Sequence, residues 1–288
     1  VKDNRAASTL WLYDTYEHAF LDFVGDIPVS SVTRLMLEDF FAWARNNRGR
    51  GPNAGFVFIR HVKTMFLWAE EMDICPCPVR KFPKVTETPP DTKRFTDEEI
   101  RKLLSTVPAE FTDFRDMIVF GLHTGLRPQE LRQLQPAQLI GDGSGNYSVF
   151  IQHHKTAKSA HEPKPRSVPL TPDAKDIALR HIAAHPKAEF VFLNGKGKPY
   201  TRNVFRQRLR RWCKRAGIPP RPPYALRHTF GSMEAEANVN QTVIAQMMGH
   251  TQLRTTSRYI ANNAEHHRVA IGAVGNRIAG IQDNNDAR

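Results

Sequence analysis

Five side chains spread over the second half of the 288-residue sequence have types suited to chemistry at a phosphate. They are Arg127, Lys155, Arg227, His250 and Tyr259. Guanidinium groups bind phosphate oxygens through paired, charge-assisted hydrogen bonds, and lysine or histidine can transfer a proton. A tyrosine phenol can act as a nucleophile and later leave again, because its ordinary pKa is about 10. Such chemistry requires that the fold bring these groups together.

Each of these residues also has a simpler structural explanation when it is taken alone. Tyr259, for example, follows a Thr-Thr-Ser-Arg run, where a half-buried helix residue is the usual interpretation. Their local sequences in chain order carry more information: Thr-Gly-Leu-Arg-Pro-Gln-Glu-Leu at 124–131, Lys-Thr-Ala-Lys at 155–158, Tyr-Ala-Leu-Arg-His at 224–228, Gly-His at 249–250, and Tyr259. Together they resemble the tyrosine recombinases, the phage integrase family. The resemblance covers Thr96 to Ile260 at the level of motifs and the first third of the chain more loosely.

The resemblance implies a role for each of the five residues in breaking and rejoining DNA. Tyr259 would attack the scissile phosphate and form a 3′-phosphotyrosine. Arg127 and Arg227 would hold the non-bridging oxygens, and His250 would donate a hydrogen bond to the phosphate. Lys155 would protonate the departing 5′ oxygen, with Lys158 as the second choice for that acid.

Three further positions near the motifs have open roles. The family usually carries histidine where this sequence has Tyr224, and a phenol is a poor general base near neutral pH. His228, one helical turn later, either compensates for that change or packs locally. Glu130, one turn after Arg127, either fixes that guanidinium or a neighbouring histidine, or forms a surface salt bridge.

The sequence carries 41 basic and 29 acidic residues, a formal net charge of +12. Residues 1–90 hold 11 of each sign, so residues 91–288 carry the whole excess. The segment 201–221 has eight basic residues and no acidic one: Arg202, Arg206, Arg208, Arg210, Arg211, Lys214, Arg215 and Arg221. Such a block of one sign predicts a polyanion partner, and nucleic acid fits better than a membrane surface because the block lacks a large apolar face. The first seven of these residues, together with Lys158, are the predicted DNA-binding residues.

The pattern of apolar residues predicts two domains in a mainly α-helical protein with a small antiparallel β-sheet, an α+β fold. We expect residues 1–85 to form a helical domain, which the resemblance identifies as a core-type DNA-binding domain. Five prolines between residues 76 and 90 predict an extended linker, placed at 86–95. Residues 96–288 form the expected catalytic domain with a C-terminal tail helix.

Local signals place the elements of the second domain. Thr96 and Glu99 form a capping box that begins a helix through Leu104, and Pro128 suits the first turn of another helix. Alternating runs predict a hairpin from Tyr147–Ile151 and Ser167–Leu170 and a short strand at Phe190–Leu193. The other predicted helices are Thr112–Leu122, Pro172–His185, Arg202–Ala216, Tyr224–Ala237, Gln241–Met248 and Leu253–Ile260.

Cysteine and histidine spacing gives no sign of a cofactor. The three cysteines, Cys75, Cys77 and Cys213, do not form a disulfide framework, and Cys-Pro-Cys-Pro at 75–78 is a loop without a second ligand pair. The histidines lack the spacing of a metal site. We therefore expect metal-independent chemistry with no cofactor. The same cysteine usage favours a reducing compartment, the cytoplasm, with a bacterial or phage origin and nucleoid association implied by the resemblance.

The resemblance also implies the partners. We expect a homotetramer on double-stranded DNA with a specific core site, no membrane, and accessory DNA-bending proteins as possible helpers. The tail after Tyr259 either covers its own domain or docks on a neighbouring protomer. The leading interpretation is a site-specific recombinase or integrase of a mobile element. A type IB topoisomerase and a DNA-binding regulator that has lost catalysis are the alternatives, the latter suggested only by Tyr224.

Overall fold

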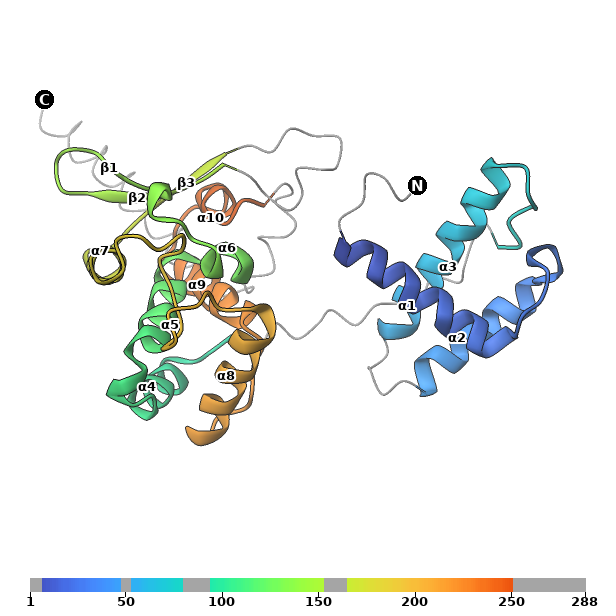
Figure 1. The fold of residues 1–288 in the computed structure, drawn as a ribbon, viewed down its shortest axis with the longest axis horizontal. Coiled ribbons are helices and arrows are strands. Elements are labelled where there is room, and N and C mark those ends of the chain that lie inside the picture. Colours follow the sequence, from blue (N-terminus) through green and yellow to red (C-terminus); the bar gives the residue numbers. More distant parts are fainter. Residues whose placement is uncertain (1–6, 48–52, 80–93, 153–164, 251–288) are drawn as a thin grey trace, which may run out of the picture. The chain divides into compact units, whose positions relative to one another are not determined.

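The computed structural model describes residues 7–47, 53–79, 94–152 and 165–250. The chain divides into two compact units, Val1–Pro90 and Asp91–Arg288, each with its own apolar core (Figure 1). The predicted linker at 86–95 falls outside the described ranges except for Arg94 and Phe95, so it stays a prediction. None of the helices within these ranges is long and apolar enough to cross a bilayer.

In its described residues, the first unit has three α-helices, α1 (Ala7–Val24), α2 (Arg34–Asn47) and α3 (Asn53–Glu71). Their inward faces follow the helical spacing of the apolar residues, because positions three and four apart lie on one side of a helix. The buried set includes Tyr16, Ala19, Phe20, Leu37, Phe40, Ala44, Phe58, Val62 and Phe66. Aromatic rings pack edge to face in this core, as between Phe20 and Phe40 at 5.0 Å.

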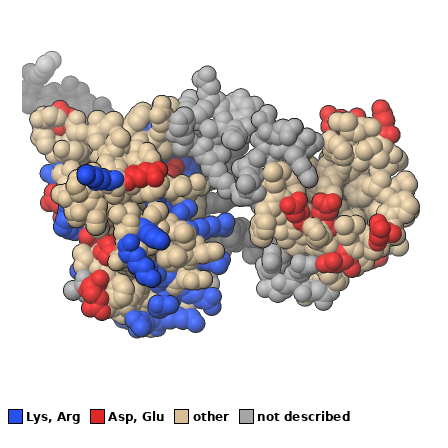
Figure 2. Space-filling model, in the orientation of Figure 1, with Lys and Arg blue, Asp and Glu red and all other residues tan. Residues whose placement is uncertain are grey.

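Charge is distributed unevenly within the first unit. Residues 7–47 and 53–79 carry nine acidic residues but only four basic ones, Arg34, Arg45, Arg60 and Lys63. On the face of this unit that Figure 2 presents, the acidic side chains stand out. The neutral balance of residues 1–90 therefore does not extend to the helices that the structure describes.

The second unit is built mainly from helices around the central helix α5 (Thr112–Thr124), which packs against α7 and α9. The other α-helices in its described residues are α4 (Asp97–Thr106), α6 (Pro128–Arg132), α7 (Pro172–Ala184), α8 (Arg202–Arg215), α9 (Tyr224–Glu236) and α10 (Gln241–Met248). The predicted capping box is present: the Thr96 hydroxyl accepts from the Glu99 amide, and the Glu99 carboxylate accepts from the Thr96 amide. Pro128 occupies the first turn of α6, as its missing N–H allows.

A three-stranded antiparallel sheet lies beside α10 and α6 in Figure 1. Its order is β1 (Leu139–Gly141), β2 (Tyr147–Ile151) and β3 (Arg166–Pro169). Val149 on β2 pairs with Leu139 on one side and with Val168 on the other. The predicted hairpin is therefore confirmed, and β3 contacts α10, so the sheet edge adjoins the end of that helix.

The predicted strand at Phe190–Leu193 is wrong, and the short strand β1 was not predicted. A tight turn at Asn194–Lys198 leaves only a single bridge, between Leu193 and Pro199, where a strand was expected. Strand β1 has three residues and depends on pairing with β2, a contact that local alternation does not reveal. The predicted helix at Leu253–Ile260 and the tail helix lie outside the described residues.

Gly125 ends α5 in a left-handed conformation with φ +57°, just before Arg127. A Cβ at this position would lie 2.2 Å from Cδ1 of Phe230, so alanine adds a clash to the backbone strain. We expect Gly125→Ala to lower the free energy of unfolding by about 3 kcal/mol, combining left-handed strain and overpacking. Urea unfolding of the whole chain measures this change.

Gly197→Ala is the matched control, because Gly197 also has a positive φ of +68° but nothing lies within 4 Å of its added Cβ. Its cost should be about 1 kcal/mol, the strain of the backbone alone. Equal losses for the two variants would show that Phe230 does not press against the turn that positions Arg127.

Candidate active site

Arg127 is held at the N-terminal end of α6 by contacts on two sides. Its backbone φ and ψ, −60° and 145°, place it as the last extended residue before the helix. Its Nη1 donates to Oε1 of Glu130 at 3.0 Å, and its Nη2 donates to the carbonyl oxygen of Gly249 at 2.8 Å. The first motif and the Gly-His motif therefore meet through this guanidinium, which joins residues 122 positions apart in sequence.

Arg227 lies in the first turns of α9 and has no exposed surface. Its Nη1 donates to the carbonyl of Gly125 at 2.8 Å, and its Nη2 donates to the carbonyl of Met248. Its Nε is buried and has no hydrogen-bond partner within the described part of the chain. Burial and the charge of Arg127 lower the pKa of Arg227, but an arginine remains protonated near neutral pH. Arg227 is therefore a buried cation at the centre of the second unit.

Arg166, the first residue of β3, belongs to the same cluster but was missed by the sequence analysis. Its Nη1 and Nη2 donate to the two oxygens of Glu130, at 3.1 and 2.6 Å, and its Nε donates to the carbonyl of Met247 at 2.8 Å. A signal for it exists in the sequence. Alternate residues of a strand point to the same face. Arg166 is two residues before the buried Val168, so the charged side chain of Arg166 points to the buried face of β3.

Glu130 is the carboxylate that this cluster shares. Its side chain is 11% exposed, so it is not a surface ion pair. Burial alone would raise the pKa of Glu130, but the hydrogen bonds and charge of Arg166, followed by the charge of Arg127, lower it to about 2. The group is therefore ionised at neutral pH and binds two guanidiniums at once.

His250 follows the end of α10, which Gly249 terminates in a left-handed conformation with φ 63°. Burial, and then the charges of Arg227, Arg127, Arg166 and His228, lower the pKa of His250 to about 4. The imidazole is therefore neutral at pH 7 when no anion is bound. An approaching phosphate would raise this pKa, because its charge offsets that of the arginines.

This pKa predicts a specific pH dependence of stability. Between about 6.5 and 4, the unfolded state binds a proton at position 250 more readily than the folded state, so stability present above pH 6.5 is lost as the pH falls towards 4. His250→Gln should remove about 1–2 kcal/mol of that loss, after a discount for solvent screening. Urea unfolding of both proteins at pH 7.5 and pH 4.5 measures the difference, and parallel pH profiles would contradict the assignment. Glu130 cannot produce the same effect, since its stabilisation is lost only as the pH falls below its usual range towards 2.

Tyr224 and His228, one turn apart on α9, contact each other with ring centroids 5.2 Å apart. Tyr224 is 40% exposed. His228 is half-buried and near enough to His250 to influence its pKa. His228 therefore lies beside the cluster, with Tyr224 next to it. The described contacts do not show either residue acting in place of the usual histidine. Lys155, Lys158 and Tyr259 lie outside the described residues.

The basic block, which consists of seven residues on α8 and Arg221 beyond it, divides into two groups. Arg202, Arg206, Arg210, Arg211, Lys214 and Arg215 are exposed. Arg208 is instead half-buried; it donates to the Tyr200 hydroxyl at 2.9 Å and packs on the Tyr200 and Phe111 rings. Arg221 forms an ion pair with Glu99 at 2.8 Å and stacks on Phe95. The structure thus separates six exposed cations from two that support the fold, and Figure 2 shows basic side chains gathered over the α8 side of the second unit.

Within the described ranges, no group of three or more histidine, cysteine, aspartate or glutamate residues is arranged to hold a metal ion. Cys75 and Cys77 are buried in the core of the first unit as free thiols. The candidate site is instead a cluster of three guanidiniums, one carboxylate and His250, and it concentrates positive charge.

Known proteins share both the sequence pattern and this fold. The model of the phage integrase family matches residues 93–266, more than half of the chain. The chain belongs to the phage integrase family. This finding confirms the family resemblance read from the five motifs, and the matched range includes Lys155 and Tyr259 as well as the described site.

Relatives of this family member span most of its length. It is 27% identical over 272 residues to the tyrosine recombinase XerA of Thermococcus kodakarensis, covering 93% of this chain and 89% of that protein. It is 26% identical over 231 residues to the tyrosine recombinase XerC of Actinobacillus pleuropneumoniae, covering 77% and 72%.

Solved structures share the fold of the family member. The Tn1549 transposon integrase in complex with transposon right end DNA superposes with a TM-score of 0.77 at 20% identity, covering 95% of this chain and 96% of that one. A lambda integrase dimer bound to a core site gives 0.71 at 17% identity, covering 91% and 92%. The predicted mainly α fold with a small antiparallel sheet is confirmed.

Proposed function

We propose that the protein is a site-specific DNA recombinase that cleaves and rejoins strands through a 3′-phosphotyrosyl intermediate, for integration or excision of a mobile element. One observation carries the proposal. Arg127 and Arg227, 100 residues apart in sequence, donate to the adjacent carbonyls of Gly249 and Met248. Both guanidiniums are therefore gathered with His250 at the end of one helix, and this is where we place the scissile phosphate.

The chemistry of strand cleavage explains why such a cluster is needed. A pentavalent phosphorane carries more negative charge than the phosphodiester, and preorganised cations stabilise it without the reorganisation that water requires. We assign this role to Arg127 and Arg227, whose paired donors match phosphate oxygens. The buried Nε of Arg227, a donor with no partner in the described chain, supports an oxygen ligand at this point. His250, neutral at pH 7, would donate a hydrogen bond to the same phosphate.

The nucleophile and the acid come from segments that lie outside the described residues. Tyr259 would attack phosphorus, and the bond from phosphorus to the 5′ oxygen would break as the bond to the phenol oxygen forms. Lys155, with Lys158 as the second choice, would give its proton to the 5′ oxygen. The phenol proton needs an acceptor, and His228 is better suited than Tyr224 because an imidazole accepts protons near neutral pH.

Double-stranded DNA is the proposed partner, bound through a specific core site. The exposed cations of α8 support it, since phosphate contacts from lysine and arginine provide much of the affinity for DNA. The Tn1549 and lambda integrases named above were solved with DNA. The helical first unit is proposed as a second DNA-binding domain. Because the described helices of the first unit carry an excess of acidic residues, most of the electrostatic contribution to DNA affinity is assigned to the second unit.

Assembly and location follow from the same proposal. Recombination of two duplexes cuts four strands, and each active site cuts one of them. Four copies would therefore act as a homotetramer, with accessory DNA-bending proteins as helpers. Docking of the tail on a neighbouring copy would couple assembly to activity. The protein would act where its DNA is, in association with the nucleoid in the cytoplasm.

The test is covalent capture of DNA in the absence of metal. The full chain is mixed, with EDTA present, with a pool of nicked duplexes of randomised sequence, and the DNA retained after denaturation is sequenced. A recombinase should retain strands with a common sequence, each attached through its 3′ end. Binding without attachment would favour the regulator that has lost catalysis. Relaxation of supercoiled DNA with no common sequence would favour the topoisomerase, which the names of the relatives above also disfavour.

Salt dependence of binding separates the two groups of cations on α8. Each phosphate contact adds a slope near −0.9 to a plot of log affinity against log salt concentration. Arg210→Gln should therefore make the slope shallower by about one unit while leaving the free energy of unfolding within about 0.5 kcal/mol, because an exposed surface residue supports little of the fold.

Arg208→Gln is the matched control for Arg210→Gln, two residues away on the same helix. Since Arg208 bonds Tyr200 and packs on two rings, its loss should lower stability by about 1–2 kcal/mol and leave the salt slope unchanged. Fluorescence anisotropy at several salt concentrations gives the slopes. Equal slopes for both variants and the unchanged protein would remove α8 from the DNA interface.

A further inference from the structure

Arg166 is a buried arginine that none of the five motifs contains. Its side chain is 5% exposed, and it begins β3, opposite Ile151 of β2. A buried charge is costly unless other groups pair with it and bind its hydrogen-bond donors. Its contacts therefore indicate what this arginine supports.

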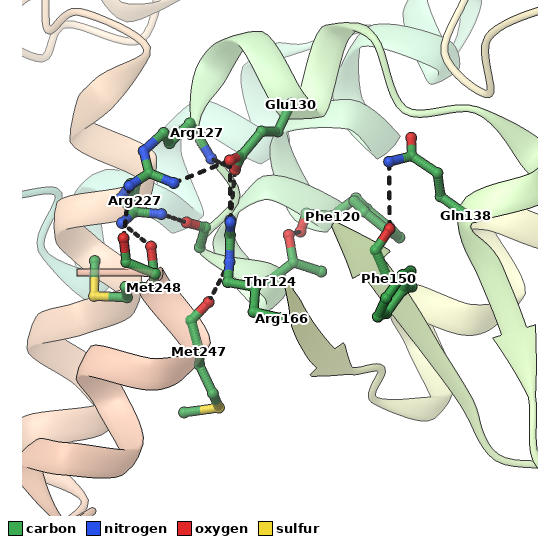
Figure 3. Close-up of polar contacts among 12 residues, drawn as sticks. Phe120, Thr124, Arg127, Glu130, Gln138, Phe150, Arg166, Arg227, Met247 and Met248 are labelled. Atoms are coloured by element: carbon green, nitrogen blue, oxygen red, sulfur yellow. Dashed lines mark hydrogen bonds and ion pairs between the residues drawn. The ribbon is translucent and has the colours of Figure 1, made fainter. Parts of the chain in front are cut away.

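The first partner of Arg166 is Glu130, which it binds with both terminal nitrogens. The same carboxylate binds Arg127 twice, accepting from Nη1 at 3.0 Å and from the backbone amide at 2.8 Å. Glu130 is thus a bridge whose two oxygens are oriented by Arg166 on one side and Arg127 on the other (Figure 3). If Arg166 were removed, Arg127 would still donate to that carboxylate, but the connection from Glu130 to β3 would be lost.

The second partner of Arg166 is the C-terminal end of α10. The last carbonyls of a helix lack intrahelical partners and carry its negative partial charge. Here three successive ones each accept from a different arginine: Met247 from Arg166, Met248 from Arg227 and Gly249 from Arg127. The three arginines therefore fix the chain immediately before His250.

Gly249 adds a steric link between Arg166 and this helix end. A Cβ at Gly249 would lie 3.0 Å from both Cδ and Nη1 of Arg166, so the arginine packs directly over the glycine backbone. Arg166 thus touches both the support of Arg127 and the residue that precedes His250.

We propose that Arg166 is a positioning residue for strand cleavage, which acts through Glu130 and the end of α10 to hold Arg127 and His250 in place. This inference rests on the proposed function. Arg166 is assigned no contact with DNA, because its Nε, Nη1 and Nη2 each donate to a protein oxygen. Lysine should not replace it well, since an ammonium is a point charge and cannot span two carboxylate oxygens and a carbonyl in one plane.

The experiment compares Arg166→Gln and Arg166→Lys with the unchanged chain on a nicked duplex identified by covalent capture. Affinity for DNA and the single-turnover rate of covalent attachment are measured separately. We expect the rate to fall about 10²-fold for Arg166→Gln, the size of effect that misplacement of a catalytic group by about 1 Å produces. Affinity should change less than about threefold, and lysine should restore only part of the rate.

Arg180→Gln is the matched control, because it removes another arginine that is paired with a carboxylate. Arg180 on α7 lies 2.7 Å from the carboxylate of Asp116 on α5. It should leave both rate and affinity unchanged. Thermal unfolding of every variant shows which remain folded, and Arg166→Lys keeps the test available if the glutamine variant does not fold. Cleavage at the unchanged rate in a folded Arg166 variant would overturn the inference.

A double-mutant cycle tests whether Arg166 acts through Glu130. If it does, Glu130→Gln combined with Arg166→Gln should be little slower than the slower single variant, because both remove the same bridge. Losses that multiply, or an affinity that falls as much as the rate, would show that Arg166 contacts DNA independently and would overturn the inference.

A measurement without DNA separates this inference from the proposed function. NMR titration of the Glu130 carboxyl should give a higher pKa in Arg166→Gln than in the unchanged chain, because the main group that lowers it is gone. If the unchanged chain forms no covalent adduct, the proposed function fails while this titration still tests the bridge. An unaltered Glu130 titration would overturn the inference whatever the activity.

Discussion

Arg227→Ala is expected to slow covalent attachment to DNA by about 10³-fold or more, the loss that follows removal of one preorganised donor to a developing oxyanion. It should also lower the free energy of unfolding by about 3–5 kcal/mol, because the carbonyls of Gly125 and Met248 lose their partner inside the core. Single-turnover kinetics on a nicked duplex and urea unfolding measure the two effects.

Arg127→Ala separates the chemical effect from the structural one. Its side chain is 18% exposed, and Glu130 keeps Arg166 as a partner. We expect a comparable loss of rate with a smaller loss of stability, about 1–2 kcal/mol. Arg180→Gln, which removes an exposed cation from α7, controls for net charge. An Arg227 variant that cleaves normally while folded would contradict the proposed role of the buried guanidinium.

Tyr259→Phe is expected to abolish the covalent adduct, since it removes the single oxygen atom that attacks phosphorus. Affinity for DNA should stay within about twofold, because no phosphate contact and no charge is lost. Denaturing gel electrophoresis of labelled duplex measures the adduct, and fluorescence anisotropy measures the affinity. Tyr224→Phe is the control with the same atomic change, and its adduct should persist.

The loss of adduct in Tyr224→Phe rather than in Tyr259→Phe would contradict the assignment of the nucleophile. Peptide mapping of the adduct would then identify which residue carries the DNA. The assignment of Tyr259 depends on the sequence motif and on the family match over residues 93–266, since this residue lies outside the described structure.

Elements with a local cause could be predicted from the sequence. The capping box at Thr96 and Glu99, the proline at the first turn of α6, and the alternation of β2 and β3 each depend on residues close together in the chain. The helical spacing of apolar residues likewise predicted that the first unit is helical. Motif order was sufficient to identify the family, because each motif sits in the local structure that its residues favour.

Features that depend on tertiary contacts could not be predicted in this way. The pairing of Arg166 with Glu130 spans 36 residues and requires the register of the sheet against α6, which no local pattern specifies. The different fates of Arg208 and Arg210, adjacent to Leu209, depend on which side of α8 faces Tyr200. The strand expected at Phe190–Leu193 is reduced to a single bridge between Leu193 and Pro199, although Val191, Phe192 and Leu193 are buried.

The central claim is that the guanidiniums of Arg127 and Arg227 neutralise charge on one scissile phosphate. It is tested most directly with a duplex in which a methyl group replaces one non-bridging oxygen at the cleavage position, because the uncharged linkage needs less cationic stabilisation. For each protein, the rate on the methyl-substituted duplex is divided by the rate on the normal duplex. This ratio should be at least about tenfold greater for Arg127→Ala than for the unchanged chain, and Tyr259→Phe should be inactive on both duplexes. The same ratio for Arg127→Ala and the unchanged chain would contradict the account.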